Sequence, residues 1–454
     1  MDIKLISPSG IMYRNGGIFP RALRYAPSTL TTLAALVPSE LEAKITLADE
    51  GVDDVKLNDS PDLVGITAIT GTANRTYAIA DSYRSKGVPV VIGGVHPTLM
   101  PQEAMEHADS VVTGLGFESW PQLLRDFDKG EMQRIYTQRP NIDLTNLPSP
   151  RLDLLKPWSY ITKTSIQATF GCPYRCDFCA VVAKQNQYIH RPVKDVIKEL
   201  EGMDSKFVVF VDPSPTEDKK YIKELWTAMI PLKKRWGGLA TVRIAQDDEL
   251  VSLAAKSGCT GLLLGFESVS QDGVNVINKD FNRVGSYREV VKKLHDNGIA
   301  INGTFMFGMD TDDKDSFKRT VDFVQENNID LPRYAIITPF PGTALFDRLD
   351  REGRILTKNW ALYDAQHVVF QPKNLSPDEV REGQLWAWEQ TYKSKSIMKR
   401  VIGSRCSPFI SLFTNFAYKY YGDRLRNYSD EVMLEIEEKW NPKPQFAGLE
   451  KKIG

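Results

Sequence analysis

The chain has 454 residues, too many for one ordinary hydrophobic core, so two or three domains are expected. Apolar residues make up 42% and charged residues 25%, the balance of a globular protein in water. The net charge of −1 argues against a nucleic-acid partner. With no signal-like start and no apolar run near the ~20 residues of a membrane span, we expect a cytoplasmic protein.

The first 140 residues alternate apolar runs with stretches of helical period. The runs are rich in Val, Ile and Leu without strict alternation, which is typical of strands buried on both faces of a parallel sheet. We therefore predict a doubly wound, Rossmann-like α/β domain over residues 1–140. The expected strands cover 3–9, 43–49, 63–69, 88–94 and 110–114.

Residues 139–157 contain four prolines and little periodicity, so a linker is predicted over 141–158. A second β/α series follows, and six such units in a row indicate a full or partial β/α barrel, TIM-like in kind, over 159–365. Its strands are expected at 165–170, 206–212, 238–244, 261–267, 301–308 and 333–339.

The pattern becomes helical from residue 366 to 454, with expected helices at 376–402 and 427–440, each opened by a serine-led cap. Between them, residues 407–421 are rich in aromatic side chains. Such a stretch is consistent with core, with an apolar substrate pocket or with a lipid contact. A peripheral membrane contact therefore stays open.

Three of the five cysteines, Cys172, Cys176 and Cys179, stand at spacings of four and three directly after the first expected barrel strand. The carboxyl ends of barrel strands are where such folds carry out chemistry. A closed zinc site needs a fourth ligand, for which only His190 is near. A redox dithiol needs two cysteines. An iron–sulfur cluster held by three thiolates leaves one iron open to an outside ligand.

The motif C-x-x-x-C-x-x-C, with Phe178 before the third cysteine, resembles the signature of radical S-adenosylmethionine (SAM) enzymes. The segments 207–213, 261–280, 298–313 and 337–349 resemble later strands of that barrel in the same order. Residues 61–114 resemble the cobalamin-binding domain that precedes the barrel in B12-dependent members, and the carboxyl-terminal helices resemble an extra domain of that subgroup.

Three departures from the subgroup are visible. The second barrel strand of the subgroup often ends in two aspartates and an asparagine, whereas here it ends in Asp212-Pro213-Ser214. The subgroup often carries G-E-x-E at the end of the strand expected here at 110–114. This chain has Leu115 and Phe117 in place of the two acids. No histidine has an aspartate two residues earlier, as in the D-x-H-x-x-G motif. The lower face of cobalamin is therefore not expected to be held by a protein histidine of that motif.

The resemblance implies three cofactors: a 4Fe–4S cluster, SAM and cobalamin. It implies that the three cysteines ligate the cluster. The residues expected near SAM are Phe178, Asp212, Arg243, Glu267, Ser268, Gly303 and Pro339. The residues expected at cobalamin, beyond the strand ends of an open sheet, are Ser7, Thr67, Thr70, Gly93, Gly94, His96 and Gly114.

The resemblance also implies the reaction. One SAM methylates cobalamin, a second yields a 5'-deoxyadenosyl radical, and methyl passes to an unactivated carbon of a small or lipid-like substrate. An electron donor such as flavodoxin or ferredoxin is expected. Alternatives are cyclisation, oxidation or rearrangement by the same domains, and a non-catalytic zinc scaffold. RNA methylthiolation fits less well, because no cysteine precedes Cys172.

Overall fold

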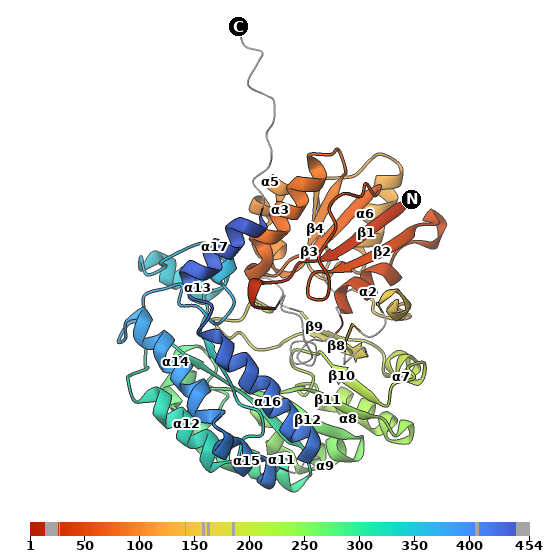
Figure 1. The fold of residues 1–454 in the computed structure, drawn as a ribbon. Helices are drawn as coiled ribbons and strands as arrows, with labels where there is room; N and C mark the ends of the chain where they lie inside the picture. Colours follow the sequence, from red (N-terminus) through yellow and green to blue (C-terminus); the bar gives the residue numbers. More distant parts are fainter. Residues whose placement is uncertain are drawn as a thin grey trace.

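The computed structural model describes residues 1–13, 26, 28–140, 142–156, 159–160, 164–183, 187–404 and 408–441. Two six-stranded parallel sheets dominate these residues. The amino-terminal sheet lies above the barrel sheet, and the carboxyl-terminal helices run along one side of both (Figure 1). The predicted α/β class with a helical end is confirmed, whereas the predicted domain boundaries stay a prediction.

The amino-terminal sheet has the strand order β2-β1-β3-β4-β5-β6. Apolar side chains fill both of its faces. One face packs against α2 and α6, and the other packs against α3 and α5. All five predicted strands form, and the sequence reading missed the short edge strand β6. The strands are β1 (Asp2–Ser7), β2 (Lys44–Asp49), β3 (Leu63–Thr67), β4 (Val90–Gly93), β5 (Ser110–Thr113) and β6 (Ile135–Thr137).

Helices join these strands in the right order for a doubly wound sheet. They are α2 (Ser28–Ala35), α3 (Ala73–Arg84), α4 (Val95–Leu99), α5 (Pro101–His107) and α6 (Ser119–Asp128). The segment 142–156 that follows has one 3-10 turn at Leu152–Leu154.

The barrel sheet has the order β14-β13-β12-β11-β10-β7, a partial barrel in which β7 and β14 are the edges. Its strands are β7 (Ser165–Ile166), β10 (Phe207–Phe210), β11 (Arg235–Ala240), β12 (Cys259–Glu267), β13 (Ala300–Phe307) and β14 (Arg333–Ile336). Helices cover its outer face, namely α7 (Val193–Glu201), α8 (Lys219–Met229), α9 (Asp248–Lys256), α11 (Tyr287–Asp296) and α12 (Ser316–Glu326). Two shorter helices, α10 (Gln271–Val276) and α13 (Ala344–Arg351), pack in a separate cluster with Phe178.

Four predicted barrel strands are shorter than expected, and two of them change course. The strand expected at 165–170 breaks after Ile166, and β8 (Thr169–Gly171) instead pairs antiparallel with β9 (Tyr188–His190). The break arises because the Asp212 carboxylate accepts hydrogen bonds from the backbone N–H groups of Ala168 and Thr169, at 3.0 and 2.5 Å. The strand expected at 238–244 ends at Ala240 and continues as a 3-10 helix, Val242–Gln246.

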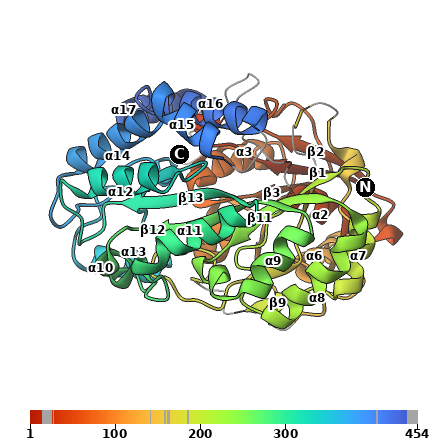
Figure 2. The same ribbon diagram turned by 90° about the horizontal axis from the view of Figure 1, so that it is seen from below.

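The carboxyl-terminal helices are α14 (Pro377–Thr391), α15 (Ser394–Gly403), α16 (Pro408–Leu425) and α17 (Asp430–Trp440). They form one layer along the side of the barrel (Figure 2). The expected helix 376–402 is therefore two helices, and the aromatic stretch forms most of α16. Residues 405–407, including Cys406, lie outside the described residues. None of the described helices is both long enough and apolar enough to cross a membrane.

Two arginines, the buried Arg400 and the partly buried Arg381, hold this layer in place by donating to backbone carbonyls. Arg400 donates to Thr391 O, at the end of α14, and to the Asn415 side chain, both at 2.8 Å. Arg381 donates to the carbonyls of Gln366, Leu425 and Tyr428. Because the last carbonyls of a helix lack intrahelical partners, Arg400 satisfies the carbonyl of Thr391, the last residue of α14. Arg381 adds a second hydrogen bond to the carbonyls of Leu425 and Tyr428, which also accept from the Tyr428 N–H and the His367 ring.

Candidate active site: a cysteine loop facing a glycine-edged cavity

The three cysteines lie on one loop that leaves β8. Gly171 starts the loop at φ 77°, and a Cβ there would stand 1.7 Å from the Gln187 carbonyl oxygen, so only glycine lets the loop pass. Cys172, Cys176 and Cys179 are free thiols and are partly exposed. The Cys179 N–H donates to the Cys176 carbonyl at 3.1 Å, which fixes the turn between the second and third thiols.

Neighbouring segments hold the backbone of this loop. The Asp177 N–H donates to Ile277 O at 3.1 Å, and Asp177 O accepts from the Leu345 N–H at 2.9 Å. The Asn278 side chain donates to Arg175 O at 2.7 Å. Since these bonds use main-chain groups of the loop, the cysteine side chains stay available as ligands.

The chemistry of this donor set suits an iron–sulfur cluster, which proteins hold through thiolates. Burial raises the pKa of Cys176 to about 12, and the positive charge of Lys279 opposes that rise. A bound cationic cluster would supply the remaining stabilisation of the thiolates. The described residues contain no group of three or more His, Cys, Asp and Glu side chains arranged to hold a metal ion. His190, the fourth ligand of the zinc hypothesis, stacks on Tyr221 and contacts Asp218.

A polar cluster that the sequence reading missed in part lies beside the loop. Tyr174, between the first two cysteines, donates its hydroxyl hydrogen to Glu217 and accepts a hydrogen bond from Arg243. Thr241 donates to the other oxygen of Glu217 at 2.7 Å. Arg243 was predicted to lie near SAM, and the structure places it here, 3.5 Å from Glu217. The signal for Glu217 was its position shortly after a barrel strand.

Glu267 ends β12 in a strained conformation. Its φ is 65°, a left-handed value that costs a non-glycine residue free energy and is common at functional sites. Its carboxylate accepts from the Lys279 ammonium at 2.6 Å, and both side chains are nearly buried. Lys279, which also donates to Gly265 O at 3.1 Å, was missed because its segment reads as a loop. The pair places a compensated charge beside the cysteine loop.

The other residues predicted to contact SAM have mixed placements. Ser268 is buried next to Glu267 and accepts a hydrogen bond from the Ser270 N–H. Phe178 packs against the apolar cluster of Ile277 and Phe370. Pro339 is buried in the loop after β14. Contacts of these three with SAM stay a prediction.

Contacts of Asp212 and Gly303 with SAM also stay a prediction. The Asp212 carboxylate is fully buried, which raises its pKa to about 6; its Oδ1 holds the turn at Thr169, and its Oδ2 has no hydrogen-bond partner among the described residues. Gly303 lies in the middle of β13. A Cβ there would meet Ile329 at 2.9 Å and Phe266 at 3.3 Å, so this glycine allows close packing of the outer layer.

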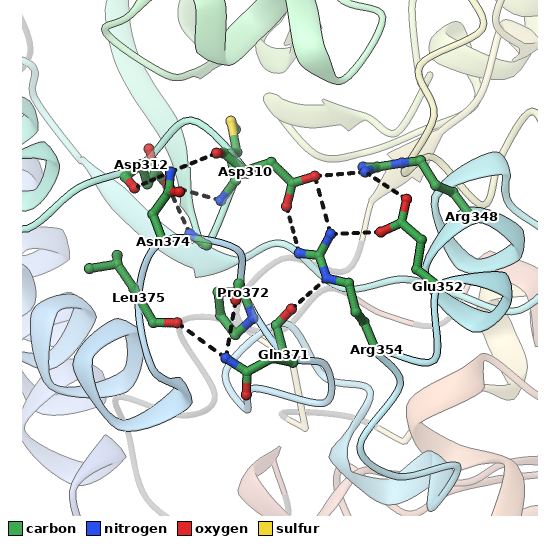
Figure 3. Close-up of polar contacts among 11 residues, drawn as sticks. Asp310, Asp312, Arg348, Glu352, Arg354, Gln371, Pro372, Asn374 and Leu375 are labelled. Carbon is green, nitrogen blue, oxygen red and sulfur yellow. Dashed lines mark hydrogen bonds and ion pairs between the residues drawn. The ribbon is translucent and has the colours of Figure 1, made fainter.

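A salt-bridge network closes the end of the barrel after β13 (Figure 3). The Asp310 carboxylate accepts from Arg348 and Arg354, each at 2.6 Å, and Arg354 also pairs with Glu352 at 2.8 Å. Burial raises the pKa of Asp310, but the hydrogen bonds from the two arginines outweigh it and lower the pKa overall. Asn374 donates to Asp310 O at 2.8 Å. The network therefore ties the β13 loop to the chain after α13.

A cavity of about 300 Å³ separates the carboxyl edge of the amino-terminal sheet from the cysteine loop. Four of the residues predicted to bind cobalamin lie on it: Thr67, Gly93, Gly94 and Gly114. Residues of the loop and its surroundings form the opposite wall: Gln167, Phe170, Gly171, Ala180, Val181 and Pro213. The two regions thus share one space.

The sheet side of this cavity fits a flat, apolar ring system. Gly94, at φ 110°, has no room for a Cβ, which would meet Ala68 O at 2.7 Å. Ile69 and Val95 line the cavity and are exposed, although they are apolar. Exposed apolar side chains around backbone-lined glycines favour a corrin, whose faces are wide and largely apolar.

Ser7, Thr70 and His96 do not line the cavity, so their predicted contacts with cobalamin stay a prediction. Ser7 ends β1 directly after Ile6, which pairs with the cavity-lining Ile66 of β3. His96 is fully buried within α4, and its ring nitrogens face Thr70 and Glu103, each at 3.3 Å. Trp360 donates to the same Glu103 at 2.8 Å. His96 and Thr70 therefore belong to the packing that joins the amino-terminal sheet to the chain after the barrel.

The comparisons with known proteins agree with this geometry. Residues 166–324 match the family model of the Radical SAM superfamily, and residues 40–124 match that of the B12 binding domain. The chain is 34% identical to the bacteriochlorophyllide d C-12(1)-methyltransferase of Chlorobaculum tepidum over 83% of this chain and 85% of that protein. It is 25% identical to the anaerobic magnesium-protoporphyrin IX monomethyl ester cyclase of Cereibacter sphaeroides, over 74% of this chain and 61% of the cyclase.

Among solved structures, the fold resembles that of the radical SAM methyltransferase TsrM from Kitasatospora setae, solved with cobalamin and a 4Fe–4S cluster bound. The TM-score is 0.65 at 15% identity, and the match covers 94% of this chain and 99% of that one. The cofactors of this chain are accordingly a 4Fe–4S cluster, SAM and cobalamin. The protein belongs to the cobalamin-dependent radical SAM enzymes.

Proposed function

We propose that the protein transfers a methyl group to an unactivated carbon of a flat, apolar small molecule of the tetrapyrrole type. The observation that carries the proposal is the shared cavity. Its two walls are the glycine edge of the amino-terminal sheet and the first turn of the cysteine loop. A methyl carrier bound to one wall therefore faces the site of radical formation at the other.

When bound, the cluster and SAM supply a 5'-deoxyadenosyl radical, and cobalamin carries the methyl group. The chain's own residues position these groups. Cys172, Cys176 and Cys179 hold the cluster, while Gly93, Gly94 and Gly114 let the corrin approach backbone. The apolar rim at Ile69 and Val95 excludes water, which protects a radical from side reactions.

We favour a tetrapyrrole over other apolar substrates because of the sequence similarity to one relative. The 34% identity to a bacteriochlorophyllide methyltransferase extends over most of both chains. A chlorin and a corrin are also similar in size and flatness, so a gap lined by apolar side chains suits both. We further propose a one-electron protein donor such as flavodoxin or ferredoxin, and a reducing, cytoplasmic setting that keeps the thiols free.

The test is a product count with anaerobically reconstituted protein, a bacteriochlorophyllide acceptor, SAM, cobalamin and a reductant. We expect methylated chlorin, S-adenosylhomocysteine and 5'-deoxyadenosine in equal amounts. Each methyl transfer consumes one SAM as the methyl donor and a second SAM as the source of the radical. Formation of 5'-deoxyadenosine with no methylated product from any chlorin tested would contradict the proposed substrate class.

Ring formation or oxidation is the second candidate, because the chain is also similar to a cyclase of the same architecture. Such a reaction uses the radical without net methyl transfer. The same assay separates the two candidates, since a cyclase forms 5'-deoxyadenosine and a dehydrogenated product without stoichiometric S-adenosylhomocysteine.

A further inference from the structure

The tip formed by the end of α15 and the start of α16 carries large apolar side chains in the open. Ile402 is 81% exposed and Phe409 is 79% exposed, although both types are usually buried. Met398, Ile410 and Phe416 are also exposed. Met398 and Ile402 are four residues apart on α15, and Phe409 and Phe416 are seven apart on α16, so each pair lies on one face of its helix. We call these five residues the apolar tip.

The segment that carries the apolar tip has charged side chains of a single sign. From residue 390 to 422 the chain has no Asp or Glu, while Lys393, Lys395, Lys399, Arg400 and Lys419 fall within the described part of that stretch. Arg400 is buried, and Lys419 pairs with Asp423 at 2.7 Å. Lys393, Lys395 and Lys399 are exposed, and no described carboxylate forms an ion pair with them. Lys393 bonds the Gln390 side chain, and Lys399 bonds the Gln325 carbonyl.

The apolar tip lies at the far end of the molecule from the amino-terminal sheet (Figure 1). Ser404 at the end of α15 donates to Asp330 at 2.7 Å, and Asp330 precedes β14. The tip is therefore at the amino ends of the barrel strands, opposite the edge that carries the cysteine loop. Whatever covers it leaves the mouth of the active site free.

We propose that the apolar tip and its three lysines form a binding surface for an anionic lipid bilayer. Exposed Phe, Ile and Met side chains enter the boundary between headgroups and acyl chains, and the lysines bind the phosphate groups. A second copy of this chain is the less suitable occupant. A symmetric contact between two tips would bring lysines of both copies together with no acidic group to compensate them.

The experiment is flotation of the full-length protein with vesicles of phosphatidylcholine alone or mixed with phosphatidylglycerol. We expect binding to the mixed vesicles that weakens with added salt, because the lysine contribution is electrostatic. The double variant Ile402→Ser/Phe409→Ser should lose binding. Lys393→Glu/Lys395→Glu should weaken it roughly twenty-five-fold or more, since each lysine near an anionic surface contributes roughly fivefold.

Matched controls separate this surface from general effects. Leu356→Ser removes an exposed apolar side chain elsewhere, and Lys206→Glu/Lys220→Glu reverses two exposed lysines on the other side of the barrel. Both should bind as the unmodified protein does. Binding that is unchanged in Ile402→Ser/Phe409→Ser, or absent from anionic vesicles, would overturn the proposal. So would a dimer in solution that this variant dissociates, because a second copy would then cover the tip.

The proposal does not depend on the proposed reaction. Vesicle binding is measured without substrate, and the tip variants should still cleave SAM at an unchanged rate because the tip is remote from the cysteine loop. A failure of methyl transfer in the unmodified protein leaves the flotation result standing, and a failure of flotation leaves the product count standing.

Discussion

The amino-terminal wall of the active-site cavity and the cysteine loop behind its opposite wall recognise their ligands by different physical means. On the amino-terminal wall, glycine backbone and apolar side chains dominate, and Gly94 leaves no room for even one methyl group. Around the cysteine loop, behind the residues that line the cavity, the important groups are thiols and compensated charges, such as Lys279 with Glu267 and Arg243 with Glu217. The amino-terminal wall selects by shape, and the cysteine-loop side, which we call the charge-based wall, selects by charge.

The difference predicts which substitutions disrupt ligand binding on each side. A shape-selective wall fails when atoms are added, and the loss is graded with the size of the addition. A charge-based wall fails when one partner is removed, because the remaining buried charge or vacant ligand position has no substitute. Substitutions on the two walls should therefore differ in size and in which cofactor they affect.

The largest effect is expected from Cys176→Ala. With one of three thiolates missing, the 4Fe–4S cluster should not assemble, and 5'-deoxyadenosine formation should fall below detection. Iron content and absorbance after anaerobic reconstitution measure this. The matched control is Cys259→Ala, a buried cysteine at the start of β12, which should keep its iron. Equal iron content in the two variants would contradict the assignment of the cysteine loop as the site that binds the cluster.

Lys279→Met should have the next largest effect. It leaves the nearly buried Glu267 carboxylate without a partner, a loss of about 3–5 kcal/mol in the free energy of unfolding. Adding Glu267→Gln should restore part of that stability because the uncompensated charge is gone. The control Lys318→Met breaks an exposed pair with Asp322 and should change the stability by less than about 1 kcal/mol. Urea unfolding measures all three, and similar losses at both lysines would refute the charge-based description.

The contrast between the walls also explains what the sequence could reveal. The three cysteines have a spacing that few other sites share, so the loop could be read directly, and most strands could be read from their apolar runs. Glu217 and Lys279 had only weak signals, because Glu217 meets Tyr174 of the loop only in three dimensions and Lys279 lies in a segment that reads as a loop. The surroundings of His96 could not be read either. A histidine after a glycine pair reads as a loop ligand, but α4 turns it inward onto Glu103.

Gly94→Ala tests the shape-selective wall. The added Cβ meets Ala68 O at 2.7 Å and forces a left-handed φ on a non-glycine residue, which costs about 1–2 kcal/mol. We expect cobalamin affinity to fall roughly tenfold or more, with S-adenosylhomocysteine formation reduced in step. Cleavage of SAM to 5'-deoxyadenosine should persist, because the cysteine loop is untouched.

Gly87→Ala is the matched control for this change. Gly87 has a similar positive φ of 77°, but a Cβ there meets nothing within 4 Å. It carries the same kind of backbone strain without a contact near the cavity, so cobalamin affinity should not change. If both variants lose affinity equally, global strain and not the shape of the wall is responsible.

The smallest effect is expected at His367, in the segment that follows the barrel strands. His367 is fully buried, and both ring nitrogens face acceptors, the Asp364 carboxylate and the Tyr428 carbonyl, each at 2.9 Å. Burial lowers the pKa of His367, but the Asp364 charge outweighs burial and the nearby Arg381, so the pKa is raised overall. Asp430 also faces the ring, at 3.9 Å. The protonated His367 ring, which donates from both nitrogens, can form hydrogen bonds with both acceptors.

Since the folded pKa lies above the unfolded value of about 6.5, the stabilisation is complete below that pH and is lost as the pH rises through the folded pKa. Urea unfolding at about pH 6 and about pH 8.5 should therefore show a decrease that His367→Gln largely removes. His190→Gln, at a partly exposed histidine near Asp218, should keep the decrease. If the His367→Gln slope equals that of the unmodified protein, the neutral ring is the native form, and the contact with Tyr428 depends on the tautomer alone.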